Sequence, residues 1–128
     1  MQVESLDHLV LTVRDLDATT AFYASVLGMR VVTFGTNRKA LAFGAQKINL
    51  HLAGREFEPK AAAPTPGSAD LCFLTTEPPE RLMEHLRSCG VAVIEGPVPR
   101  TGAVGPIRSV YCRDPDGNLI EVAHQVAS

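Results

Sequence analysis

Apolar and polar residues alternate in short runs along this chain, and two segments between the runs show helical spacing instead. The first half predicts a strand at 6–13, a helix at 17–27 and strands at 30–34, 39–43 and 47–52. Gly28 follows the helical segment, at the position where glycine commonly ends a helix. This half is therefore predicted to be a βαβββ module.

The second half repeats this order. It predicts a strand at 69–74, a helix that is opened by Pro78-Pro79 and ended by Gly90, and strands at 91–94, 107–112 and 118–123. The shift that carries Gly28 onto Gly90 also carries His8 onto Asp70, which indicates an internal duplication. Residues 54–67 contain three prolines and are predicted to be a linker.

Strand alternation places three polar side chains on faces opposite to their apolar neighbours. His51 and Glu121 are flanked by apolar residues, and His8 is followed by Leu9; we expect these apolar residues to pack on the helices. Aligning 48–51 with 118–121 by pattern puts His51 and Glu121 at equivalent positions of the two modules. The predicted fold class is α+β. Two βαβββ modules, 5–53 and 68–124, form a cupped mixed sheet with helices on its convex face, in one domain 1–128.

Two imidazoles and a carboxylate from separate strands supply nitrogen and oxygen donors for Zn, Ni, Mn or Fe. We therefore predict a divalent metal ion bound by His8, His51 and Glu121, with open positions for water or substrate. Other interpretations stay open at this point. Either histidine could be structural or merely exposed, and Glu121 could belong to the solvated side of an edge strand.

Composition narrows the classes of function. The chain has 128 residues, 45% of them hydrophobic, which suits one compact domain. It has 12 Lys and Arg against 14 Asp and Glu and no basic patch, which argues against a nucleic-acid partner. No apolar run is long enough for a membrane helix, and no signal peptide is recognisable. Three cysteines without a CxxC pair predict neither disulfides nor a zinc knuckle. A small-molecule substrate and a cytoplasmic location are expected.

Three segments carry a family resemblance. Residues 6–13, 22–29 and 114–121 resemble the glyoxalase/bleomycin-resistance/extradiol-dioxygenase superfamily, also called vicinal oxygen chelate proteins. Residues 46–51, 64–71 and 96–103 look like the branch called glyoxalase domain-containing protein 5, which includes bacterial virulence-associated members.

The resemblance implies metal ligands on the first and last strands of each module, and so nominates His8, His51, Asp70 and Glu121. Many metal-binding relatives have a histidine where this chain has Asp70. Asp70 could bind the metal, hold another ligand by a hydrogen bond, or do neither, and it is left out of the predicted ligand set.

Similarity to lactoylglutathione lyase implies a metalloenzyme acting on a small oxygen-rich or thiol-conjugated substrate. The metal would stabilise an enediolate, as in a lyase or isomerase, and Glu121 or Asp70 would act as the catalytic base. With Fe(II), two histidines and a carboxylate would instead suit a ring-cleaving or other dioxygenase. A third interpretation is a bleomycin-resistance-type protein that binds a ligand without catalysis, which the retained His and Glu positions disfavour.

Two further expectations concern partners. Arg100, Thr101 and Arg108 could hold an anionic group of the substrate, or they could be solvated surface residues. Each module leaves a free sheet edge, so a homodimer is expected, including one in which modules are exchanged between chains.

Overall fold

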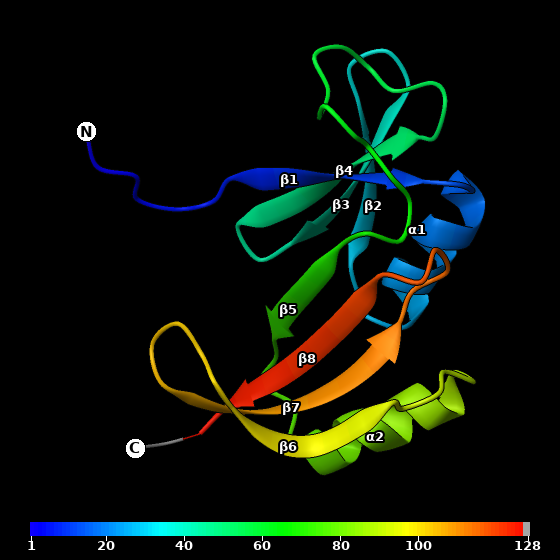
Figure 1. The fold of residues 1–128 in the computed structure, drawn as a ribbon. Coiled ribbons are helices and arrows are strands. Elements are labelled where there is room, and N and C mark those ends of the chain that lie inside the picture. Colours follow the sequence, from blue (N-terminus) through cyan, green and yellow to red (C-terminus); the bar gives the residue numbers. More distant parts are fainter. Residues whose placement is uncertain (127–128) are drawn as a thin grey trace. The chain divides into compact units, whose positions relative to one another are not determined.

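The structure is a computed structural model and describes residues 1–126 of the chain. The chain divides into two compact units, Met1–Gly67 (unit 1) and Ser68–Ser128 (unit 2). Unit 1 contains β1 (His8–Val13), α1 (Leu16–Ser25), β2 (Arg30–Phe34), β3 (Arg38–Phe43) and β4 (Gln46–Leu52). Its sheet has the order β1-β4-β3-β2, with β1 parallel to β4 and the other neighbours antiparallel (Figure 1). The predicted βαβββ order is confirmed here.

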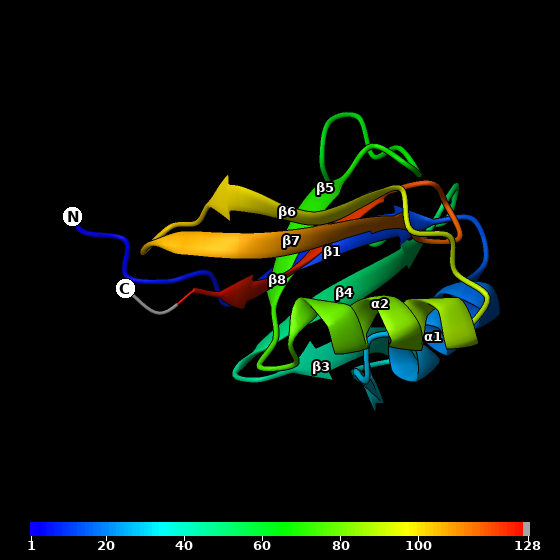
Figure 2. The same cartoon turned by 90° about the horizontal axis from the view of Figure 1, so that it is seen from below.

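Unit 2 repeats this topology. It contains β5 (Asp70–Leu74), α2 (Pro79–Ser88), β6 (Glu95–Thr101), β7 (Pro106–Arg113) and β8 (Leu119–Gln125). Its sheet has the order β5-β8-β7-β6, and its first and last strands, β5 and β8, are again the parallel pair (Figure 2). The predicted α+β class, with two modules of one design, is confirmed. Among residues 1–126, no helix is long and apolar enough to cross a membrane.

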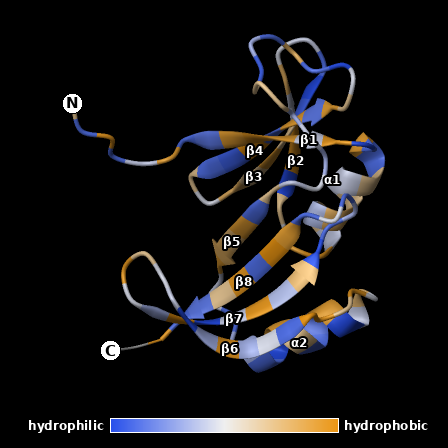
Figure 3. Cartoon of the chain, in the orientation of Figure 1, coloured by the Kyte–Doolittle hydropathy of each residue, from blue (hydrophilic) through white to orange (hydrophobic). Residues whose placement is uncertain are grey.

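Local signals in the sequence set the ends of both helices. The Asp15 carboxylate accepts a hydrogen bond from the Ala18 N–H at 3.0 Å and thereby caps α1. Helix α2 begins at Pro79, whose missing N–H costs nothing in the first turn. Leu82 and Leu86 lie about one turn apart on α2, and both are buried. In Figure 3, hydrophobic and hydrophilic positions alternate along α2 and β8.

The predicted strand at 91–94 is wrong, because the strand lies later in the chain as β6 (Glu95–Thr101). Pro97 and Pro99 lie within β6, and a proline cannot donate a hydrogen bond to a neighbouring strand. Strand β6 is an edge strand whose only neighbour in the sheet is β7. An edge tolerates proline because the missing N–H can face the unpaired side. A register shift between Glu95 and Val98 marks an irregularity in this pairing.

The helix-side faces of the two sheets form the apolar cores. In unit 2, Glu80 on α2 accepts a hydrogen bond from Arg108 on β7 at 3.3 Å, so α2 covers the face to which Arg108 belongs. Strand pairing puts Ile120 and Val122 on that same face. Both are buried, as predicted, and Glu121 between them points to the opposite face.

Candidate metal centre

One face of the unit 1 sheet collects most of the side chains that could bind a ligand. We call it the His8 face; alternation and strand pairing assign to it His8, Val10 and Thr12 of β1, Lys47, Asn49 and His51 of β4, and Arg38 of β3. Phe57, in the segment after β4, contacts this face through the His51 ring. The opposite face carries the buried Leu41, Ile48 and Leu50.

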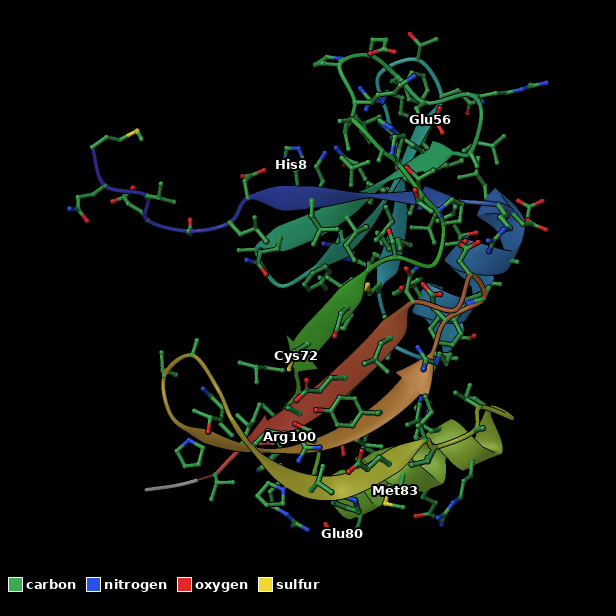
Figure 4. All side chains as sticks on the ribbon, in the orientation of Figure 1. His8, Glu56, Cys72, Glu80, Met83 and Arg100 are labelled. Carbon is green, nitrogen blue, oxygen red and sulfur yellow. The ribbon has the colours of Figure 1, made fainter. Side chains whose placement is uncertain are left out.

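His8 stands at the start of β1, and its side chain is 42% exposed (Figure 4). Its Nδ1 lies 2.9 Å from Oδ2 of Asp7. When Nδ1 donates its proton to this carboxylate, Nε2 keeps its lone pair. A carboxylate that orients an imidazole in this way is a common neighbour of metal-binding histidines.

The strand register corrects the predicted equivalence of His51 and Glu121. His8 lies opposite Lys47 in the parallel pair of unit 1, and Asp70 lies opposite Leu119 in that of unit 2. Two residues beyond these partners stand Asn49 in unit 1 and Glu121 in unit 2. The counterpart of Glu121 is therefore Asn49.

This error has a simple physical origin. A shift by two residues returns every side chain to the same face, so alternation alone cannot detect it. His51 lies four residues beyond the partner of His8, about 13 Å along the strand. Asn49 lies two residues nearer and is 6% exposed, and its Oδ1 is buried without a hydrogen-bond partner among the described residues.

The His51 ring is almost fully buried, at 3% exposure, and is already engaged. Nη2 of Arg38 lies 3.4 Å from its Nε2, and the Phe57 ring packs edge-on at 5.5 Å between centroids. A guanidinium can only donate, so Nε2 of His51 must accept and its lone pair points at a cation. Burial first, and then Arg38, lowers the pKa of His51, while Glu56 acts in the opposite direction. The role of His51 as a metal ligand stays a prediction.

The lowered pKa of His51 predicts a pH dependence of stability. The unfolded chain takes up this proton near the ordinary value of 6.5, whereas the folded chain takes it up only at lower pH. The unfolded state therefore binds more protons as the pH falls below about 6.5, and folding loses free energy there. Urea unfolding at about pH 7.5 and 5.5 should show this loss, and His51→Gln should reduce it. An unchanged slope in His51→Gln, compared with the exposed-site control His85→Gln, would contradict the assignment.

The corresponding face of unit 2 is centred on Glu121. We call it the Glu121 face; pairing assigns to it Asp70 and Cys72 of β5, Glu121 of β8, and Ser109 and Tyr111 of β7. The Ser109 hydroxyl, which is fully buried, donates to Oε2 of Glu121 at 2.5 Å. This bond fixes one carboxylate oxygen and leaves Oε1 to other partners.

Two weak acids adjoin the Glu121 carboxylate. Burial, reinforced by Glu121 and Asp70, raises the pKa of the Cys72 thiol to about 11. Burial also raises the pKa of Tyr111, against the opposing effect of its hydrogen bond from Arg100. Without a bound metal ion, the Cys72 thiol is therefore neutral near pH 7.

The three predicted substrate-binding residues have different surroundings. Arg100 donates to the Tyr111 hydroxyl at 3.0 Å and to Glu95 at 3.4 Å, at the edge of the Glu121 face (Figure 4). Arg108 pairs with Glu80 on the helix-side face, away from Glu121. Thr101 is exposed at the end of β6. Their predicted contact with a substrate remains a prediction, and Arg108 is on the wrong face to share one with Glu121.

The turn before β8 fixes the start of both parallel strands of unit 2. Asp114 accepts hydrogen bonds from the Asn118 N–H at 3.0 Å and from the Asn118 side chain at 2.8 Å. Oδ1 of Asn118 in turn accepts the Ala69 N–H at 2.9 Å. Ala69 precedes Asp70, and Asn118 precedes the strand that carries Glu121. The Asp-Pro-Asp-Gly-Asn motif thus sets the heights of Asp70 and Glu121 in the sheet.

Asn118→Ala should be strongly destabilising, because it removes the side-chain hydrogen bond to the buried Asp114 carboxylate and the amide oxygen that accepts the Ala69 N–H. We expect the free energy of unfolding to fall by about 2–3 kcal/mol, measured by urea unfolding. Amide hydrogen exchange at Ala69 should also accelerate. A change below about 0.5 kcal/mol would contradict the role of this network.

The donors meet the chemical requirements of a divalent metal only in part. Among residues 1–126, no group of three His, Cys, Asp or Glu side chains is close enough to hold an ion. The residues on the two faces nevertheless include an imidazole oriented by Asp7, a carboxylate oriented by Ser109 and the orphaned amide oxygen of Asn49. This mixture of nitrogen and oxygen suits Zn, Mn, Ni or Fe.

Asn49, Ser109, Cys72, Tyr111 and Arg38 lie on these faces although the sequence analysis did not single them out. Alternation within each strand could have placed all five there. No local pattern could have distinguished them from other strand residues, because their neighbours come from strands that are distant in the sequence.

A family model for the Glyoxalase/Bleomycin resistance protein/Dioxygenase superfamily matches residues 5–122. The chain is 58% identical to virulence protein STM3117 of Salmonella typhimurium over 126 residues, which covers 98% of this chain and 88% of that protein. It is 59% identical over 123 residues to the glyoxalase domain-containing protein RDO1 of Mycosarcoma maydis, which covers 96% of this chain and 69% of that protein.

Solved structures agree with these matches. The crystal structure of STM3117 superposes on this chain with a TM-score of 0.97 at 58% identity. The match covers 98% of this chain and 100% of the STM3117 chain. The crystal structure of lactoylglutathione lyase from Agrobacterium tumefaciens matches with a TM-score of 0.74 at 23% identity. The match covers 96% of this chain and 95% of the lyase chain, and it shows a shared fold. The repeated βαβββ units and these matches together place the chain in the glyoxalase/bleomycin resistance protein/dioxygenase superfamily.

Proposed function

We propose that this chain is a divalent-metal-dependent enzyme of the glyoxalase type, with His8 and Glu121 as metal ligands. Its substrate would be a small oxygen-rich or thiol-conjugated compound. The observation that carries the proposal is the buried Ser109 hydroxyl, which holds Glu121 at 2.5 Å on a face that also carries Asp70. The contact of Asp7 with His8 supports the same role for the imidazole.

The chemistry of the neighbouring residues fits this proposal. When bound, the ion would act as a Lewis acid toward substrate oxygens. Ser109 holds Oε2 of Glu121, and a carboxylate partly released from the ion would take a proton from a substrate carbon. Asp70 is exposed on the same face and is the alternative base. Asn49 offers a neutral amide oxygen at the position that corresponds to Glu121.

Metal analysis is the first test. The purified protein, incubated with Zn, Ni, Mn or Fe(II) and desalted, should retain about one ion per chain in mass spectrometry. The loaded protein should isomerise the hemithioacetal of methylglyoxal and glutathione. Failure to retain any of the four ions would overturn the proposal in favour of binding without catalysis. Metal retention with oxygen consumption, but no isomerisation, would favour a dioxygenase.

The third predicted ligand is tested in the same series. His8→Gln should abolish metal retention, because an oriented imidazole is lost. If His51 is also a ligand, as the sequence predicted, then His51→Gln should do the same. Its contact with Arg38 leads us to expect that His51→Gln retains the ion.

We also propose a homodimer in the cytoplasm. The edge strands β1 and β5 carry exposed apolar side chains, with Val10 at 44% and Leu74 at 60% exposure. Exposed apolar residues of this kind are typical of interfaces. Cys72 and Cys89 are free thiols, which is consistent with a reducing compartment. Light scattering coupled to size exclusion should give twice the chain mass, and a monomer mass would contradict the dimer.

A further inference from the structure

A cluster of cations and aromatic rings lies on the His8 face and is used by no step proposed above. The Arg38 guanidinium lies over two rings, with its Cζ at 5.1 Å from the centroid of Phe34 and at 4.4 Å from that of Phe57. Nζ of Lys47 lies 4.0 Å from the centroid of the same Phe34 ring. One aromatic ring is therefore shared by two cations.

Neither cation has an acidic partner in the part of the chain that the structure describes. Throughout residues 1–126, no carboxylate oxygen lies within salt-bridge distance of Arg38 or Lys47. This contrasts with Arg100 and Arg108, each of which has a glutamate partner. The difference does not follow from a shortage of acids, since the chain has 14 acidic residues and a net charge of -2.

The guanidinium also has unused donors. Arg38 spends one N–H on Nε2 of His51, and its Nε is buried without any hydrogen-bond partner in residues 1–126. A buried unpaired donor costs folding free energy, and the cost is larger for a charged group. On the neighbouring strand β4, Asn49 lies opposite Ala40, two residues from Arg38. Its amide Oδ1 is also buried and has no hydrogen-bond partner among the described residues. One face thus carries two cations without acidic partners, an unsatisfied N–H on one of them and an unsatisfied amide oxygen.

We propose that Arg38 and Lys47 form a subsite for a small oxyanion, with the carboxylate, phosphate or phosphonate chemistry that a guanidinium fork binds. The planar fork provides paired N–H groups for two oxygens, and the two rings hold it in place. Because His51 accepts from Arg38, it orients the fork and is a positioning residue. Phe57 lies in the segment between β4 and β5, which contains no helix or strand, and its ring covers one side of the fork. The subsite does not depend on a bound metal.

The test is a nuclear magnetic resonance titration of the full chain at fixed pH. Sodium acetate serves as the carboxylate probe and methylphosphonate as the phosphonate probe, with potassium chloride at matched ionic strength as the reference. The ring signals of His51 and Phe57 should shift saturably with at least one probe. The ring signals of His85 on α2 should not. Equal shifts in chloride would overturn the subsite, because they would report ionic strength only.

Matched variants assign the effect to the fork. Arg38→Met should weaken binding of the probe at least about 10-fold, because a charge-assisted bidentate contact is lost. Arg55→Met, at an exposed arginine of the same unit, should leave it unchanged. Arg38→Lys is the second variant, for the case that Arg38→Met does not fold. It keeps the positive charge but lacks the planar fork, so binding of the probe should again fall about 10-fold. Unchanged affinity in both Arg38 variants would overturn the proposal.

Two further arms separate the sources of binding. Lys47→Met should weaken methylphosphonate, which carries more charge, by about threefold more than acetate. The titration is then repeated with 1,10-phenanthroline, a neutral chelator that removes bound metal. Shifts that persist are carried by Arg38 and Lys47, whereas shifts lost with the chelator would overturn the subsite. The metal-binding experiment and the anion titration can therefore fail independently of each other.

Discussion

Glu121→Gln is expected to lower the affinity of the chain for its divalent ion by more than about 100-fold, since even the loss of a residue that only supports a ligand costs 10–100-fold. Glutamine has nearly the same shape and can still accept the Ser109 hydrogen bond, so the sheet should remain intact. The substitution removes the negative charge that attracts the divalent cation. Isothermal titration with Zn²⁺ measures the affinity, and the hemithioacetal assay measures the activity.

Glu95→Gln is the matched control for this change. Glu95 is a carboxylate of the same unit, stands opposite Tyr111 in the β6–β7 pair and forms an ion pair with Arg100. This surface pair contributes about 0–1 kcal/mol. Its variant should therefore bind the ion like the original chain. If Glu121→Gln and Glu95→Gln retain metal equally, Glu121 is not a ligand.

Gly96→Ala is expected to destabilise unit 2 strongly. The backbone of Gly96 has φ +121, and a Cβ placed there would lie 2.5 Å from the carbonyl oxygen of Ser109 and 2.8 Å from Cα of Val110. Both obstacles are backbone atoms of β7, so no side-chain rotation can relieve them. The free energy of unfolding should fall by about 3 kcal/mol or more, as judged from urea unfolding.

Gly44→Ala separates the clash from the backbone conformation. Gly44 also has positive φ, +51, but a Cβ there would meet nothing within 4 Å. Its variant should lose only the cost of the left-handed region, about 1–2 kcal/mol. Equal losses in Gly44→Ala and Gly96→Ala would contradict close packing of β6 on β7. Gly96→Ala should also disturb the neighbouring Ser109, and so weaken metal binding in whatever fraction stays folded.

Apart from β6, the sequence by itself determined the elements and the faces of their side chains. Alternation in 47–52 and 118–123 separated Ile48 and Ile120 from His51 and Glu121 without reference to any distant residue. Local stop signals such as Gly28 and Gly90 marked the ends of the helical segments. These signals are local because side-chain direction depends only on backbone geometry within a few residues. The repeated βαβββ order followed from them.

Only the tertiary structure decided which side chains are neighbours. The register placed Asn49, not His51, at the counterpart of Glu121, because a two-residue shift leaves every face unchanged. The strand at Glu95–Thr101 depended on its place at a sheet edge, which no local pattern encodes. Arg38 acquired its rings and its histidine from three other segments of the chain. Pairing between distant strands fixes such contacts, and the sequence of one strand does not indicate which strand it pairs with or in which register.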